Sequence, residues 1–129
     1  MVAPVIKGIQ QNNVVANAKH YIGKFDGWDT DLSSPTRSPR TSFAENNQET
    51  NRGAVDEIVD ERTRFEMYYP PFASASKAGL GSIMCSYNKI DAGGQPGGTW
   101  SCENPITLGN LKKDLGFTGW CSFLRDDLY

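Results

Sequence analysis

Apolar residues occur along the chain in short blocks separated by polar, turn-forming segments, and these blocks predict the secondary structure. The block at 14–22 is rich in β-branched and aromatic residues and follows the turn-prone pair Asn12-Asn13. It predicts a buried strand whose polar residues gather at its end. Two further blocks, at 82–88 and 119–124, predict two more strands.

The first helix is predicted to begin after Asp60, whose side chain is suited to an N-cap. Pro70 and Pro71 interrupt the helical pattern, which predicts either a kink or a second short helix over 73–78. Gly79 is expected to end it, because glycine readily adopts the left-handed conformation found after helices.

A second helix is predicted from Asn104, where a capping side chain is followed by proline at the first helical position. Leucines at near-helical spacing, including Leu111 and Leu115, predict its buried face, and Gly116 its end. The segments 23–47 and 91–99, rich in glycine or small polar residues, are expected to be loops.

The predicted order is strand, helix, strand, helix, strand, which favours an α/β fold with a parallel sheet. Three strands leave two unpaired sheet edges, so the pattern is that of a slice of a larger domain, and self-association through those edges is expected. At 129 residues, with 38% hydrophobic and 22% charged residues, the composition is that of an ordinary globular chain.

Charge and hydropathy exclude two classes of partner. The formal net charge of -2 gives no basic surface for nucleic acid. No stretch of about 18 apolar residues is present, so no membrane-spanning helix is expected. The first seven residues lack the basic and apolar regions of a signal peptide, which leaves the localisation open.

Cysteine and histidine usage bears on disulfides and metals. Three reduced, mostly buried thiols at Cys85, Cys102 and Cys121 are the favoured expectation, and a Cys85–Cys102 pair with Cys121 left over is the alternative. His20 is the single histidine and no Cys-x-x-Cys spacing occurs, so no metal site is predicted.

Four short stretches, taken in order, resemble the barrel domain of the β-glucosidases of glycoside hydrolase family 3. They are Ala-Lys-His-Tyr-Ile-Gly at 18–23, Asn-Gln-Glu-Thr-Asn-Arg at 47–52, Met-Cys-Ser-Tyr-Asn at 84–88 and Leu-Gly-Phe-Thr-Gly-Trp at 115–120. The predicted helix at 60–72 also matches. The resemblance implies that residues 1–129 are about three βα units of a (β/α)₈ TIM-like barrel, part of that family's N-terminal domain.

What the resemblance implies for the site is a pocket for a β-linked glucoside. Lys19 and His20 resemble the pair that donates hydrogen bonds to the hydroxyls of the sugar. Met84 and Tyr87 resemble the pair that packs near the sugar ring, Tyr87 beside the nucleophile. For Lys19 and His20 the alternative is a charge at a strand end beside a core histidine. For Met84 and Tyr87 the alternative is ordinary packing in the core. No cofactor is implied, because retaining hydrolysis proceeds through a covalent glycosyl-enzyme intermediate.

The same resemblance gives Gln48, Glu49 and Arg52 a supporting role in the loop around the site. Between 24 and 46 the sequence departs from the family, which runs almost directly from the first motif to the second. A surface insertion, which loops tolerate, and a retained intron are both compatible with this departure. Sequencing of the mature transcript distinguishes them.

The second departure is at the nucleophile. Counting from the Gly-Phe-Thr-Gly motif, the family's aspartate falls on Leu124, which cannot attack an anomeric carbon. Asp126 or Asp127 would replace it only after a slip of two or three residues, and the acid/base comes from outside the motifs present. The chain is therefore not expected to hydrolyse glucosides alone. The alternative function is a non-catalytic sugar-binding or interaction remnant of such an enzyme.

Overall fold

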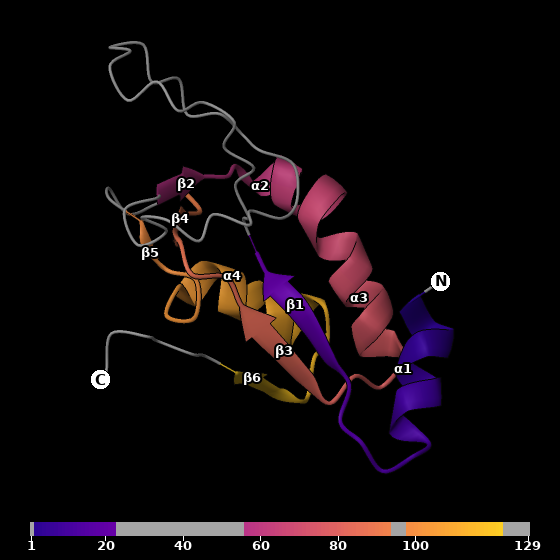
Figure 1. The fold of residues 1–129 in the computed structure, drawn as a ribbon. Helices are drawn as coiled ribbons and strands as arrows, with labels where there is room; N and C mark the ends of the chain where they lie inside the picture. The colour runs from indigo at the N-terminus through magenta and orange to yellow at the C-terminus, as the bar shows by residue number, and fades with distance from the viewer. Residues whose placement is uncertain (1, 23–55, 94–97, 123–129) are drawn as a thin grey trace, which may run out of the picture.

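The fold is built around a small parallel sheet in the computed structural model, which describes residues 2–22, 56–93 and 98–122. The sheet has the order β1-β3-β6, and both pairs of neighbours are parallel (Figure 1). Its strands are β1 (Asn17–Tyr21), β3 (Ser82–Cys85) and β6 (Trp120–Ser122). The three strands and their parallel pairing confirm the α/β prediction, although the strands are shorter than the apolar blocks.

The connection from β1 to β3 ends in an unbroken helical run made of α2 (Glu61–Thr63), the π-helical turn η2 (Arg64–Tyr68) and α3 (Tyr69–Lys77). Asp60 caps it as predicted, since its Oδ1 accepts a hydrogen bond of 2.9 Å from the Thr63 N–H. The prolines do not separate two helices. They occupy the first turn of α3, where the wider π turn precedes them and a missing N–H is tolerated.

The connection from β3 to β6 ends in α4 (Pro105–Gly109) and a second π-helical turn, η3 (Asn110–Asp114). Leu111 is fully buried, and Gly116 follows the helix with a positive φ of 66°, as predicted. The helix lies behind the sheet in Figure 1.

Asn104 joins this helix to the rest of the fold. Its Oδ1 accepts from the N–H groups of Ile106 and Thr107, both at 3.1 Å, and its Nδ2 donates to the Ile90 carbonyl at 2.7 Å. We expect Asn104→Ala to lower the free energy of unfolding by about 2 kcal/mol, because the side chain is buried and makes all three bonds. Urea denaturation measures the loss. Asn12→Ala, at an exposed asparagine, is the control, and an equal effect of both variants would contradict the role of the cap.

Two parts of the fold were not predicted. The helix α1 (Val2–Gln10) buries Ile6 and contacts α3. A second sheet of order β2-β4-β5 contains β2 (Asp56–Ile58), β4 (Lys89–Asp91) and β5 (Thr99–Trp100). It lies beyond the carboxyl ends of β1 and β3 (Figure 1). The expectation of a loop throughout 91–99 was therefore wrong at both ends of that segment.

The hydrophobic core lies between the parallel sheet and the helices. Tyr21, Ile83, Leu111 and Phe117 belong to one buried cluster. On the other face of the sheet, Lys19 is exposed and Trp120 keeps 58% of its surface exposed. Among the described residues, helices thus cover only one face of the sheet.

Candidate functional site

The first and third motifs meet on the uncovered face of the sheet. Lys19 and Met84 are register partners on β1 and β3, and Met84 is in turn the partner of Ser122 on β6. Partners in a parallel ladder project from the same face, so these three side chains form one row across the sheet. Lys19 is exposed, and the other two are partly buried. The structure therefore brings together two of the four side chains expected to contact a sugar.

The neighbouring row belongs to the core. Ile83 is completely buried, and Ala18 and Cys121 pack against the same cluster. His20, the third expected contact, is partly buried and lies at an irregularity of β1, where the register with β3 shifts between Lys19 and Tyr21. It lies beside Lys19 in the chain, at the carboxyl end of the strand.

Tyr21 anchors that end of β1 and was not singled out by the sequence. Its ring is completely buried between Tyr69, with centroids 5.9 Å apart, and Phe72, at 5.0 Å. Its hydroxyl donates a hydrogen bond of 2.6 Å to the Thr107 carbonyl on α4. Burial raises the pKa of Tyr21, so the phenol stays protonated as that donor. The residues before it are thereby held against both helices.

Tyr87, the fourth expected contact, follows the carboxyl end of β3 and is partly buried. Its neighbour Ser86 ties this segment to the end of β1. The Ser86 N–H donates to the Tyr21 carbonyl at 2.9 Å, and the Ser86 hydroxyl donates to the Ile22 carbonyl at 2.5 Å. The strand ends that carry His20 and Tyr87 are therefore directly bonded to each other.

A disulfide closes the same region. Cys85 and Cys102 are bonded, with their Cα atoms 5.5 Å apart, so the favoured expectation of three reduced thiols was wrong. The antiparallel pair β4–β5 causes this arrangement, because it returns the chain to the end of β3. Cys121 is free, and burial raises the pKa of its thiol.

The remaining residues named from the sequence lie outside the described part of the structure. They are Gln48, Glu49 and Arg52 of the supporting loop, the segment 24–46, and Leu124, Asp126 and Asp127 around the nucleophile position. Their roles stay predictions.

Two buried charged residues were missed. Glu57 on β2 is only 8% exposed, and its pKa is raised to about 8, first by burial and then by the nearby negative charge of Asp56. Arg64 is 3% exposed and donates to the carbonyls of Val59, at 2.7 Å, and Ala92, at 2.6 Å. Their positions in short or irregular elements gave no periodic signal of burial.

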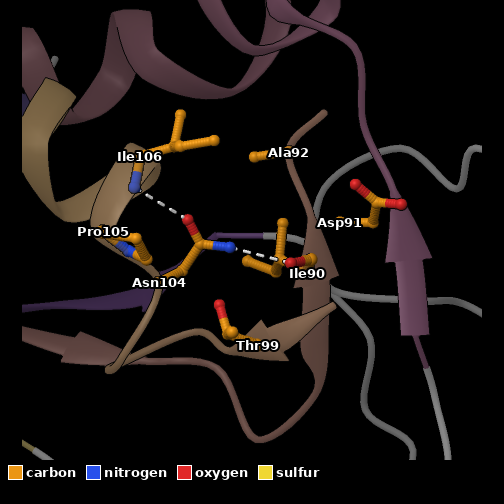
Figure 2. A pocket seen from close by; sticks show the side chains of 7 residues that line it. All are labelled: Ile90, Asp91, Ala92, Thr99, Asn104, Pro105 and Ile106. Atoms are coloured by element: carbon orange, nitrogen blue, oxygen red, sulfur yellow. Dashed lines mark hydrogen bonds between the residues drawn. The ribbon is translucent and has the colours of Figure 1, made fainter. Parts of the chain in front are cut away.

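A cavity of about 110 Å³ lies apart from the row that carries Lys19 and Met84. Figure 2 shows it beside the start of α4, with the Asn104 side chain bonded to Ile90 and Ile106. Its lining consists of Ile90, Asp91, Ala92, Thr99, Asn104, Pro105 and Ile106. None of the expected sugar contacts lines it.

Residues 2–22, 56–93 and 98–122 contain no group of three or more His, Cys, Asp or Glu side chains placed to hold a metal ion. Within these ranges every helix is too short or too polar to pass through a bilayer.

Comparison with known proteins gives a consistent set of relatives, although no family model matches the chain. The chain is 36% identical over 119 residues to Beta-glucosidase 1 of Saccharomycopsis fibuligera. The aligned segment covers 92% of the chain and 12% of that protein. The solved β-D-glucoside glucohydrolase of Trichoderma reesei superposes with a TM-score of 0.69 at 35% identity, covering 99% of the chain and 14% of that structure. DesR, a β-glucosidase from Streptomyces venezuelae solved with D-glucose, gives 0.65 at 35% identity, covering 94% of the chain and 12% of DesR.

Proposed function

We propose that the chain is a segment of a β-glucosidase of glycoside hydrolase family 3 and forms the glucose-binding part of its barrel domain. The chain spans 12% of the length of the first relatives it matches. In this proposal residues 1–129 supply about three βα units of a (β/α)₈ TIM-like barrel, and 24–46 form an insertion within it. The whole protein would hydrolyse β-linked glucosides with retention at the anomeric carbon.

The one-sided cover of the parallel sheet supports the barrel. Parallel sheets are normally buried on both faces, yet Trp120 is 58% exposed on the face opposite the helices. Asn17, Ser82 and Trp120 are register partners and form a second row beside the one that contains Lys19 and Met84. In a TIM barrel the inward side chains of neighbouring strands stack in such layers. The remaining strands of a barrel would cover both rows.

The observation that carries sugar binding is the register pairing of Lys19 with Met84 on this face, near the carboxyl ends of the strands. Barrel enzymes place their sites at those ends. The Lys19 ammonium and the His20 imidazole would donate to sugar hydroxyls, and Met84 would pack against the ring. Tyr87 would present its phenol beside the position of the nucleophile. Gln48, Glu49 and Arg52 would support the loop around the pocket.

The proposal separates binding from hydrolysis. Retaining hydrolysis needs a carboxylate nucleophile and a carboxylic acid about 5 to 5.5 Å apart. The family position of the nucleophile is Leu124 in this chain. Asp126 and Asp127 would reach it only after a change of register. We therefore propose that the isolated chain binds glucose without turning over a glucoside, and this binding distinguishes it from an interaction remnant.

Titration of the purified chain with D-glucose tests the proposal. We expect saturable binding, and we expect Lys19→Met to weaken it at least about tenfold, because a charged donor to a hydroxyl is lost. Isothermal calorimetry measures the affinity, and release of nitrophenol from an aryl β-glucoside measures turnover.

Lys77→Met, at an exposed lysine on α3, is the matched control and should bind like the unmodified chain. Equal affinities for the two lysine variants would refute the role of Lys19. Turnover of the aryl glucoside by the isolated chain would refute the separation of binding from hydrolysis.

A further inference from the structure

We infer that Ser101 is a positioning residue, which fixes the direction of the Tyr87 side chain without touching the sugar. The inference that this direction matters for glucose rests on the function proposed above. Ser101 is 1% exposed and lies just before the disulfide residue Cys102.

Ser101 holds the chain on both sides of Tyr87. Its hydroxyl donates to the carbonyl of Ser86, the residue before Tyr87. Its backbone N–H donates to the carbonyl of Asn88, the residue after Tyr87, at 3.2 Å. Ser101 therefore holds the peptide group directly before Tyr87 and the peptide group that follows Asn88. With both held, the direction of the Tyr87 Cα–Cβ bond is restricted.

The fixed segment is also tied to the strand that carries Lys19 and His20. Ser86 donates its N–H to Tyr21 and its hydroxyl to Ile22, so its carbonyl, N–H and hydroxyl are all engaged. Ser86 and Asn88 are 3% and 4% exposed. Because water has little access, the loss of one of these bonds is not replaced by solvent.

The hairpin behind Ser101 makes its position rigid. The Cys85–Cys102 disulfide lies on one side of it. On the other side, Trp100 pairs with Lys89 across β4 and β5, and the Lys89 ammonium lies 5.3 Å from the centroid of the Trp100 ring. Ser101 is therefore held between a covalent bond and a strand pair.

The test measures both the glucose affinity and the NMR signals of the Tyr87 ring, which are assigned by comparison with Tyr87→Phe. We expect Ser101→Ala to shift the Tyr87 signals and to weaken glucose binding roughly three- to tenfold. Ser76→Ala is the control, because the Ser76 hydroxyl is buried on α3 and has no hydrogen-bond partner among the described residues. It should leave both readouts unchanged even if the stability falls.

Unchanged Tyr87 signals in a folded Ser101→Ala protein overturn the inference. If the unmodified chain does not bind glucose, the proposed function fails, and the ring signals alone decide whether Ser101 positions Tyr87. If Ser101→Ala does not fold, Ser101→Gly takes its place, because it lacks the same hydroxyl donor to the Ser86 carbonyl and should move the same signals. Ser101→Thr keeps a hydroxyl at this position and should leave the Tyr87 signals closer to those of the unmodified chain, so a larger shift in Ser101→Thr than in the variants without the hydroxyl also overturns the inference.

Discussion

Removal of the Cys85–Cys102 bond in the double variant C85A/C102A is expected to lower the free energy of unfolding by about 3 kcal/mol. The two residues are separated by 17 positions, so the bond closes a loop of moderate length in the unfolded chain. Loss of the bond raises the conformational entropy of the unfolded state over that loop. Alanine is preferred to serine because Cys85 is buried, where an added hydroxyl would need a partner.

The comparison of oxidised and reduced protein isolates this effect. Urea denaturation in dithiothreitol should bring the unmodified chain close to the double variant, and the double variant itself should not respond to the reductant. Cys121→Ala, at the free cysteine, should keep the response of the unmodified chain. A denaturation midpoint that the reductant does not change in the unmodified chain would show that the bond does not stabilise it.

Glu57→Gln is expected to raise the free energy of unfolding at pH 8 by on the order of 2 to 3 kcal/mol and to have little effect near pH 4.5. The pKa of Glu57 is raised from 4.5 to about 8 in the folded protein. The folded state therefore binds a proton that the unfolded state releases between these values. The contribution of Glu57 to the free energy of unfolding is therefore fully present below pH 4.5 and is lost as the pH rises to 8.

The environment of Glu57 explains why glutamine should be accepted. Its Oε1 is buried and has no hydrogen-bond partner among the described residues. The charged form is therefore destabilised by burial and by Asp56, whereas a neutral amide of the same shape avoids the burial of a charge.

Thermal unfolding of both proteins from pH 4.5 to 8.5 measures the difference. Glu103→Gln, at an exposed glutamate, should give a curve parallel to that of the unmodified chain. A constant difference between Glu57→Gln and the unmodified chain at every pH would contradict a shifted pKa as the cause.

The main sheet could be predicted because its signals are local. The block that contains Ile83 follows Gly81 and holds consecutive apolar residues, and Asn104-Pro105 combines a capping side chain with a favoured first residue. The small sheet could not be predicted in this way. Its strands contain two or three residues, too few to show an alternation, and they form because β4 pairs with both β2 and β5.

The sequence predicted side chains of the candidate site, but not the hydrogen bonds and the disulfide that hold the surrounding backbone in place. The motifs identified Lys19 and Met84, and the structure places them in register. The Ser86 hydroxyl bonds to a residue 64 positions away, and the Ser101 hydroxyl to one 15 positions away. Serine is also common in ordinary loops, so neither residue stands out in the sequence. The disulfide was weighed but not preferred, because cysteine spacing alone does not give the distance between Cα atoms.

Both helical connections contain a π turn, η2 in the first and η3 in the second. In each, the N–H that follows the turn bonds back five residues, from Tyr69 to Arg64 and from Leu115 to Asn110. Such a turn takes up one more residue than an α-helical turn while the helix continues in the same direction. In evolutionary terms, the lengths of these connections can change by one residue at 64–68 or 110–114 without any change in the register of the strands. An alignment of relatives should therefore place single-residue gaps in these two turns and none within β3.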